Sequence, residues 1–211
     1  MSVSHTVRAG TARLLLVAAC MTLMASCSLL PKATPVELHR YTLDWPPAPK
    51  AFAAGGPVIL VAPVTARTEL ASQRMAYRRT PHEIAYYSRS QWATPPAEVL
   101  GPLVVDALEA SGRFQSVVQA GSPAAANIRL DLVLEQLHHD VASDPGAVHL
   151  RLRGQLLSLD TGQVLATRQF AYTASAQNNA KSASRAWNSL LGLLLADVAA
   201  FSAEGAADSG R

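Results

Sequence analysis

The chain has 211 residues, of which 49% are hydrophobic and 16% charged, and this length can bury a core as one domain. Arg8 and Arg13 account for much of its small positive charge, because removing residues 1–26 takes Lys and Arg from 18 to 16 against 15 acidic residues. A nearly neutral domain excludes the strongly basic surface of a nucleic-acid-binding protein.

The N-terminus has the pattern of a bacterial secretion signal. Arg8 and Arg13 precede an apolar run over residues 14–24, which leads into Ala25-Ser26-Cys27. This run is too short for a bilayer core of about 30 Å, so a permanent transmembrane helix is not expected. Small residues directly before a cysteine resemble the lipobox of bacterial lipoproteins. We therefore expect residues 1–26 to be a lipoprotein signal peptide. Cys27 is expected to carry the N-terminal lipid, which includes a palmitate chain.

Cys20 follows a second lipobox-like stretch. Cleavage there would leave residues 14–19 as the apolar core, fewer than the roughly 7 to 15 residues that signal peptides use, so Cys27 is preferred. A plain signal peptide with an incidental cysteine is the alternative, and it would leave an odd free thiol. With Cys20 removed and Cys27 lipidated, no thiol remains for a disulfide or for thiolate chemistry.

A short tether and several strands are expected next. Residues 27–39 are interpreted as a lipid-anchored tether, because Pro31 and Pro35 discourage regular structure. An apolar run on both faces predicts a central strand, and turn residues between two short apolar stretches predict a hairpin. The expected strands are 41–45 and 58–64, and the expected hairpin joins 75–78 to 83–87.

Two helices are predicted on either side of a strand meander. Thr94 is expected to cap the first helix, which runs to Gly112, with Gly101-Pro102 expected to bend it or delay its start. The second helix is predicted from about Ala180 to Glu204, and its leucine stripe is expected in the core because its polar flank is poor in Lys and Arg.

The meander itself shows clear alternation of apolar and polar residues. Strands are predicted over 128–135, 148–156 and 163–173, with Asp160-Thr161-Gly162 as a turn, which gives an antiparallel meander with one wet face. The predicted fold is α+β, a single domain over 40–204 with two main helices packed on one face of a mostly antiparallel sheet. Residues 205–211 are expected to form a disordered C-terminal tail.

Few groups suggest catalysis or metal binding. His138 and His139 are neighbours on a predicted strand, so their side chains point to opposite faces and do not readily chelate one ion. The chain has neither a Gly-rich phosphate loop nor a G-x-S-x-G elbow. We expect a protein that is not an enzyme, with no catalytic residue, no metal and no cofactor.

Arginines and aromatic residues gather between residues 67 and 92. Both types are enriched at the energetic centres of protein interfaces, so a docking surface is one interpretation. The other is a hairpin whose aromatic rings pack under the first helix and whose arginines are solvated. The candidate partner-binding residues are Arg78, Arg79, Tyr86, Tyr87, Arg89 and Trp92.

In the order of these elements and in several short stretches, the chain resembles the ABC-type transport auxiliary lipoproteins, the PqiC/YmbA-like family. The resemblance covers Tyr41 to about Phe201, and Gly101-Pro102 departs from the continuous helix of the family pattern. The stretches that carry it are 41–43, 58–64, 75–78, 84–87, 89–93, 112–114 and 164–170.

This resemblance implies a non-catalytic auxiliary component of an ABC/MCE-type system that moves lipid or other hydrophobic molecules between inner and outer membranes. Its implied partners are an MCE-domain protein, an inner-membrane ABC transporter and further copies of itself in a homo-oligomeric ring, with no nucleic acid. Ser28 after the lipidated cysteine resembles an outer-membrane-sorted lipoprotein facing the periplasm. The alternatives are a structural lipoprotein of the cell wall or secretion machinery, and a periplasmic hydrolase.

Overall fold

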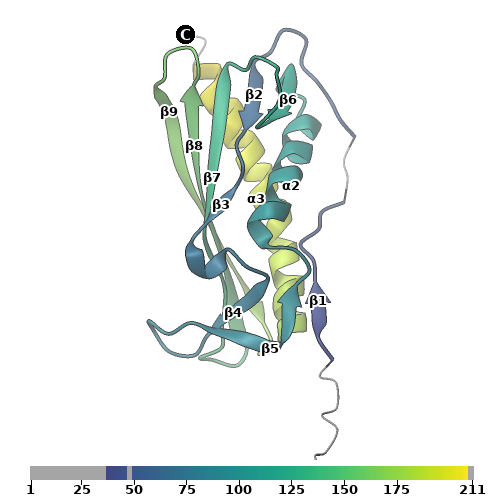
Figure 1. Cartoon of the computed structure of the whole chain (residues 1–211), viewed down its shortest axis with the longest axis vertical. Coiled ribbons are helices and arrows are strands. Elements are labelled where there is room, and N and C mark those ends of the chain that lie inside the picture. Colours follow the sequence, from purple (N-terminus) through teal and green to yellow (C-terminus); the bar gives the residue numbers. More distant parts are fainter. Residues whose placement is uncertain (1–36, 47–48, 209–211) are drawn as a thin grey trace, which may run out of the picture. The chain divides into compact units, whose positions relative to one another are not determined.

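The structure, a computed structural model, describes residues 37–46 and 49–208 (Figure 1). The predicted signal peptide, Cys27 and most of the tether lie outside the described residues, as do residues 209–211. From Leu38 onward the chain forms one compact unit, and its elements are those of the predicted single α+β domain.

Three long strands lie side by side in the sheet, and they confirm the predicted antiparallel meander. They are β7 (Ile128–Asp140), β8 (Gly146–Ser158) and β9 (Val164–Ala176), of 13 residues each. Alternate residues are buried along β8 and along β7 up to Leu134, because a strand places successive side chains on opposite faces. Gly162, with a φ of 71°, makes the turn between β8 and β9.

The other half of the sheet is parallel, so the sheet is mixed. The second edge of β7 pairs in turn with β2 (Val58–Val61), β3 (Thr65–Ala66) and β4 (Arg74–Arg78), all in parallel. The strand expected over 58–64 is broken, since Pro63 has no N–H to donate and separates β2 from β3. A further strand, β6 (Ser116–Gln119), pairs in parallel with β2 and was not predicted.

The predicted hairpin is present, and it is longer than expected. It consists of β4 and β5 (Ala85–Trp92), which pair antiparallel. A short strand, β1 (His39–Tyr41), lies parallel to the end of β5 and is shorter than the strand expected over 41–45. The chain leaves the sheet after Tyr41 because the Asn188 amide accepts the N–H of Asp44 and donates to the Thr42 carbonyl, each at 2.9 Å.

The first helix, α2 (Pro96–Ala110), begins without the predicted cap. Its N-cap position is Pro95 and no side chain caps it, so the prediction for Thr94 was wrong. The helix also runs through Pro102 instead of starting after it. Pro102 has no N–H to donate to the Glu98 carbonyl. Both residues are exposed, so this carbonyl faces water. Gly112, with a φ of 63°, follows the helix as predicted.

The second helix, α3 (Ala180–Asp208), is longer than expected. Near its start, the Asn179 side chain accepts the N–H of Ser182 at 2.8 Å. The helix passes the predicted end at Glu204 and enters the expected tail, because Gly205 and Ala206 are buried and Gly205 packs against Leu156 of β8. Residues 205–208 are therefore helix.

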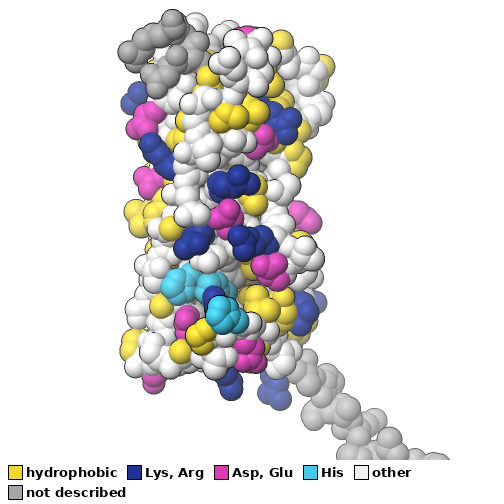
Figure 2. Space-filling model, turned by 90° about the vertical axis from the view of Figure 1, so that its left-hand side faces the viewer, with side chains coloured by type: hydrophobic (Ala, Val, Ile, Leu, Met, Phe, Trp, Pro, Cys, Tyr) yellow, Lys and Arg dark blue, Asp and Glu magenta, His cyan; other side chains and the backbone are white. Residues whose placement is uncertain are grey.

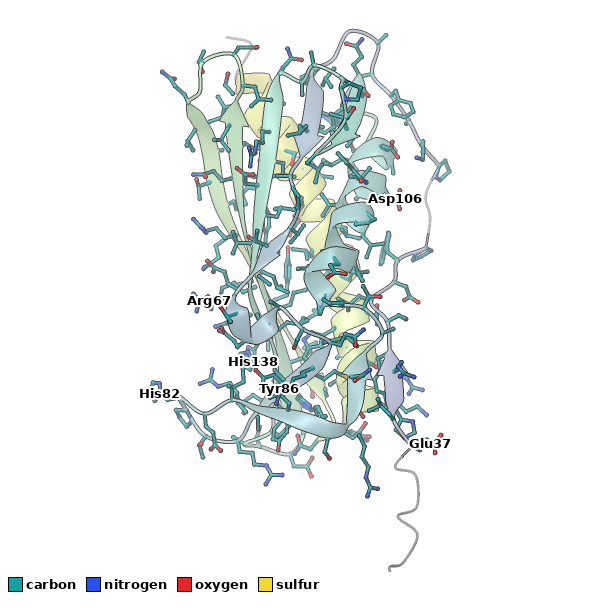
Figure 3. All side chains as sticks on the ribbon, in the orientation of Figure 1. Glu37, Arg67, His82, Tyr86, Asp106 and His138 are labelled. Carbon is teal, nitrogen blue, oxygen red and sulfur yellow. The ribbon has the colours of Figure 1, made fainter. Side chains whose placement is uncertain are left out.

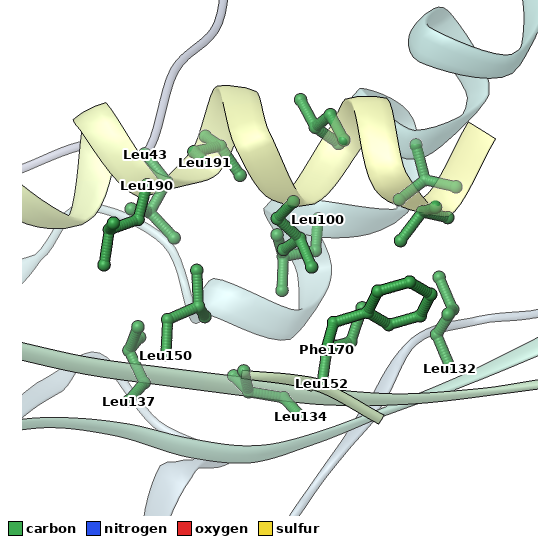
Figure 4. Close-up of a cluster of buried hydrophobic side chains, with 14 of the residues drawn as sticks. Leu43, Leu100, Leu132, Leu134, Leu137, Leu150, Leu152, Phe170, Leu190 and Leu191 are labelled. Atoms are coloured by element: carbon green, nitrogen blue, oxygen red, sulfur yellow. The ribbon is translucent and has the colours of Figure 1, made fainter. Parts of the chain in front are cut away.

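The core lies between the sheet and the two helices, as Figure 4 shows for its leucines. The stretch from Ala180 to Ala207 is long and apolar enough to cross a membrane by length and composition. One side of it nevertheless faces the sheet, where Trp187, Leu194 and Leu195 are at most 1% exposed. This burial confirms the prediction that α3 is a core helix.

Candidate functional site at the β4–β5 hairpin

The structure divides the six predicted docking residues into four groups. Trp92 is 2% exposed and packs against Trp187 of α3, with ring centroids 5.3 Å apart. A partner cannot reach a side chain in the core, so Trp92 leaves the candidate set, and its role is to join the hairpin to the last helix. Arg89 is exposed and lines neither of the hollows beside the hairpin.

Arg79, Tyr86 and Tyr87 line one hollow, of about 690 Å³, which we call the tyrosine hollow. Among the described residues, Arg79 is the only charged side chain in its wall. Its guanidinium lies 5.5 Å from the centroid of the Tyr77 ring, which in turn packs on Tyr87 at 5.0 Å. The full lining is Tyr77, Arg79, Tyr86, Tyr87, Ser88, Val141, Ala142 and Asn178.

Tyr86 and Tyr87 are adjacent on β5, so their rings lie on opposite faces, Tyr86 on the side of Arg74 and Tyr87 on the side of Tyr77. The Tyr86 hydroxyl donates to the Glu69 carbonyl at 3.1 Å, and the Arg74 guanidinium covers the Tyr86 ring at 3.5 Å from its centroid. The Tyr87 hydroxyl shares a 2.8 Å hydrogen bond with Nδ1 of His139, which is fully buried. Burial, followed by the neighbouring Tyr77, raises the pKa of Tyr87 to about 12, so this hydroxyl stays neutral at physiological pH.

Arg78 lies on the other face of β4, because successive residues of a strand point to opposite sides. There it lines a second hollow of about 300 Å³, which we call the outer hollow. Figure 3 shows Arg67, His82 and His138 on this side of the molecule, and Figure 2 shows histidines beside arginine and acidic side chains there. Its lining is Arg67, Glu69, Leu70, Arg78, His82, Glu83, Ile84, Glu135, Gln136, Leu137 and His138.

Side chains of both charge signs line the outer hollow, and its two arginines form no ion pair among the described residues. Glu135 is tied to Arg153 at 3.5 Å and accepts a 2.9 Å hydrogen bond from Gln169. Glu83 accepts a hydrogen bond from Thr80 at 2.7 Å. Within the described part of the chain, neither Arg67 nor Arg78 has an ion-pair partner. The apolar Ile84 stands among these charges and is 41% exposed.

His138 forms the floor of the outer hollow. It is 7% exposed and stacks on His149 of β8, with ring centroids 4.9 Å apart. Burial, followed by the positive charge of His149 and then of Arg78, lowers the pKa of His138 to about 4. Burial also lowers the pKa values of His139 and His149. Burial therefore disfavours the charged forms of His138, His139 and His149.

The histidines do not assemble into a metal site. His138 stacks with His149, whereas His139 bonds Tyr87 behind the tyrosine hollow. Over residues 37–46 and 49–208, no group of three or more His, Cys, Asp or Glu side chains is placed to hold a metal ion.

A third hollow, of about 680 Å³, lies between α2 and α3. Seven of its sixteen lining residues are alanines, and Trp45 packs tightly on Gly192 in its wall. Asp106, Arg113 and Glu204 also line this groove. We place the candidate site at the hairpin, because four of the predicted docking residues, Arg78, Arg79, Tyr86 and Tyr87, line its two hollows.

Sequence reasoning missed the residues that complete both hollows. His138 and Glu135 come from β7, whereas Asn178 follows β9, far from the hairpin in sequence. They reach the site because β4 pairs in parallel with β7, with Ala76 opposite His138. The predicted antiparallel meander offered no signal for this pairing.

Comparisons with known proteins agree with this fold. A family model described as "ABC-type transport auxiliary lipoprotein component" matches residues 41–199, which confirms the resemblance inferred from the short stretches. No curated protein matches the chain.

Several solved structures are similar to the chain. Protein XCC0632 from Xanthomonas campestris, of the DUF330 family model, is 22% identical over 81% of this chain and 97% of its own, with a TM-score of 0.72. An uncharacterized protein is 19% identical over 77% of this chain and 97% of its own, with a TM-score of 0.59. The PelC dodecamer from Paraburkholderia phytofirmans is 15% identical over 71% of this chain and 93% of its own, with a TM-score of 0.43. At these identities the likeness to the first two structures shows the fold alone.

Proposed function

Because this chain belongs to the ABC-type transport auxiliary lipoprotein family, we propose that it is a non-catalytic component of an ABC/MCE-type system that moves lipid between membranes. A lipid on Cys27 would hold it in the outer membrane, with the domain facing the periplasm. Its partners would be an MCE-domain protein and the inner-membrane ABC transporter. A homo-oligomeric ring is part of the same proposal.

The observation that carries the proposal is the outer hollow, on a chain whose family serves ABC transport. An auxiliary component must recognise a protein partner, and interfaces combine an apolar centre with a polar rim. Ile84 supplies an exposed apolar contact, while Arg67 and Arg78 have no ion pair of their own among the described residues. A partner that carries carboxylates would complement these two arginines.

Glutamates beside the arginines add selectivity. Glu69 and Glu83 line the same hollow, so a uniformly acidic partner would meet repulsion as well as attraction. Complementary charge patterns of this kind favour one partner and disfavour others. We therefore place the MCE-domain contact on the outer hollow.

The test is a pull-down of the full-length protein, extracted from membranes with a mild detergent, followed by mass spectrometry of the bound proteins. We expect an MCE-domain protein or its transporter in the eluate. Arg78→Glu should weaken capture about tenfold or more, because desolvated arginines rank among interface hot spots. Arg113→Glu is the matched control, since Arg113 is exposed and lies in the wall of the groove between α2 and α3.

Cys27→Ala tests the anchor separately. Loss of the lipid should release the protein from the membrane fraction without changing the outer hollow. Capture that is equal for Arg78→Glu and Arg113→Glu would contradict the assigned surface. Recovery of cell-wall fragments or a secretin, with no MCE-domain protein or transporter, would contradict the transport role.

A further inference from the structure

The tyrosine hollow includes Ser88, two residues before Ser90, which lies opposite His39 at the start of β1. We propose that this hollow binds the anionic headgroup of a glycerophospholipid in the membrane that holds the anchor. This inference rests on the lipid-anchored placement in the proposed function and adds a ligand class to the hairpin.

The lining suits a phosphodiester. Arg79 is the only charged side chain in the wall among the described residues, so no carboxylate there repels an anion. A guanidinium forms strong charge-assisted hydrogen bonds with phosphate oxygens. The Ser88 hydroxyl and the Asn178 amide, which also line the hollow, can bond the glycerol or headgroup oxygens, and Val141 with Ala142 offers an apolar wall to the glycerol carbons.

The aromatic part of the hollow is already built. The Tyr77 and Tyr87 rings pack on each other, with centroids 5.0 Å apart, and the Tyr87 hydroxyl is fixed by His139. A ligand therefore meets ring faces whose side-chain entropy is already lost on folding. Arg79 itself is exposed and has no ion pair within the described residues, so its guanidinium is available to an incoming phosphate.

Ser88 of the hollow lies on the side of the domain where the chain enters β1. Because β1 runs parallel to β5, with His39 opposite Ser90, the chain reaches β1 from the side of Arg89 and the hairpin (Figure 1). Leu38 follows the predicted lipid site, Cys27, by eleven residues, which span at most about 40 Å when fully extended. Tyrosine and arginine, with apolar bodies and polar ends, are residues suited to the headgroup layer.

An acidic peptide of a protein partner is the competing occupant. A single cation in a hollow of about 690 Å³ matches one phosphate-bearing group better than a charged polypeptide segment, which would need several cations. The outer hollow, with its two uncommitted arginines, already offers that second kind of surface.

The test uses deacylated headgroups, which dissolve in water and do not enter detergent micelles. Full-length protein in neutral detergent is titrated with glycerophosphoglycerol, glycerophosphocholine and inorganic phosphate, and saturation-transfer NMR gives each dissociation constant. We expect glycerophosphoglycerol to bind most tightly, because it combines net negative charge with groups that reach the rings. Arg79→Gln should weaken this binding about tenfold or more, since it removes a charged hydrogen bond.

Arg185→Gln is the control, because Arg185 is exposed and lies outside the hollow. Circular dichroism and the urea midpoint of both variants show that each has folded. Equal binding by Arg79→Gln and the native chain would overturn the proposal, as would inorganic phosphate binding as tightly as glycerophosphoglycerol. Absence of headgroup binding, with partner capture lost in Arg79→Gln, would assign the hollow to the protein partner. If either of the first two results is obtained while partner capture still depends on Arg78, the proposed function stands.

Discussion

Replacing Trp92 by alanine removes a large aromatic side chain that is 2% exposed and packed against Trp187. Deleting a buried aromatic residue costs about 3 to 5 kcal/mol, from lost burial and from the cavity that remains. Because whole domains are stable by only about 5 to 15 kcal/mol, this is a large fraction of the total. With a urea m-value of about 2 kcal/mol/M, a loss of about 4 kcal/mol moves the midpoint down by about 2 M.

The assay is urea unfolding of the full-length protein in mild detergent, followed by circular dichroism. Trp92→Phe should cost much less, because a smaller ring still fills most of the site, and it should leave partner capture unchanged. Trp45→Ala is the control, since Trp45 is 41% exposed and should cost less than Trp92→Ala. The core assignment fails if Trp92→Ala lowers stability by less than about 1 kcal/mol while abolishing partner capture.

Two further predictions concern His138 and Gly146. Burial lowers the pKa of His138 to about 4, so between about pH 6.5 and 4 the unfolded chain binds a proton that the folded domain does not. Stability should fall as pH falls through this window, and His138→Asn should remove about 2 to 3 kcal/mol of that fall at pH 4.5, seen by urea unfolding at pH 7 and 4.5. A methyl group at Gly146 would overlap the Asp140 carbonyl and the Asn178 amide, so Gly146→Ala should cost about 3 kcal/mol in thermal unfolding. Gly101→Ala, which meets only Val64 at 3.9 Å, should instead be neutral or stabilising, and equal effects of the two would contradict this account.

Much of the fold follows from local patterns in the sequence. Period-two alternation along β7 and β8 and the turn at Gly162 predicted the meander, because strand periodicity and turn chemistry are properties of neighbouring residues. The leucine stripe of α3 predicted a core helix for the same reason. Local patterns failed at the ends of elements, where Thr94 leaves α2 uncapped and the burial of Gly205 extends α3.

The candidate site depended on the tertiary structure. The sequence by itself determined that arginines and tyrosines share one hairpin, and their residue types indicated a binding surface. Only the packed domain decided that Trp92 is core, that Arg78 and Arg79 serve different hollows, and that His138 and Asn178 complete them. Those outcomes follow from the parallel pairing of β4 with β7, a contact between segments about sixty residues apart in sequence. No local period encodes such a contact, because it is selected by the burial of the whole sheet against α2 and α3.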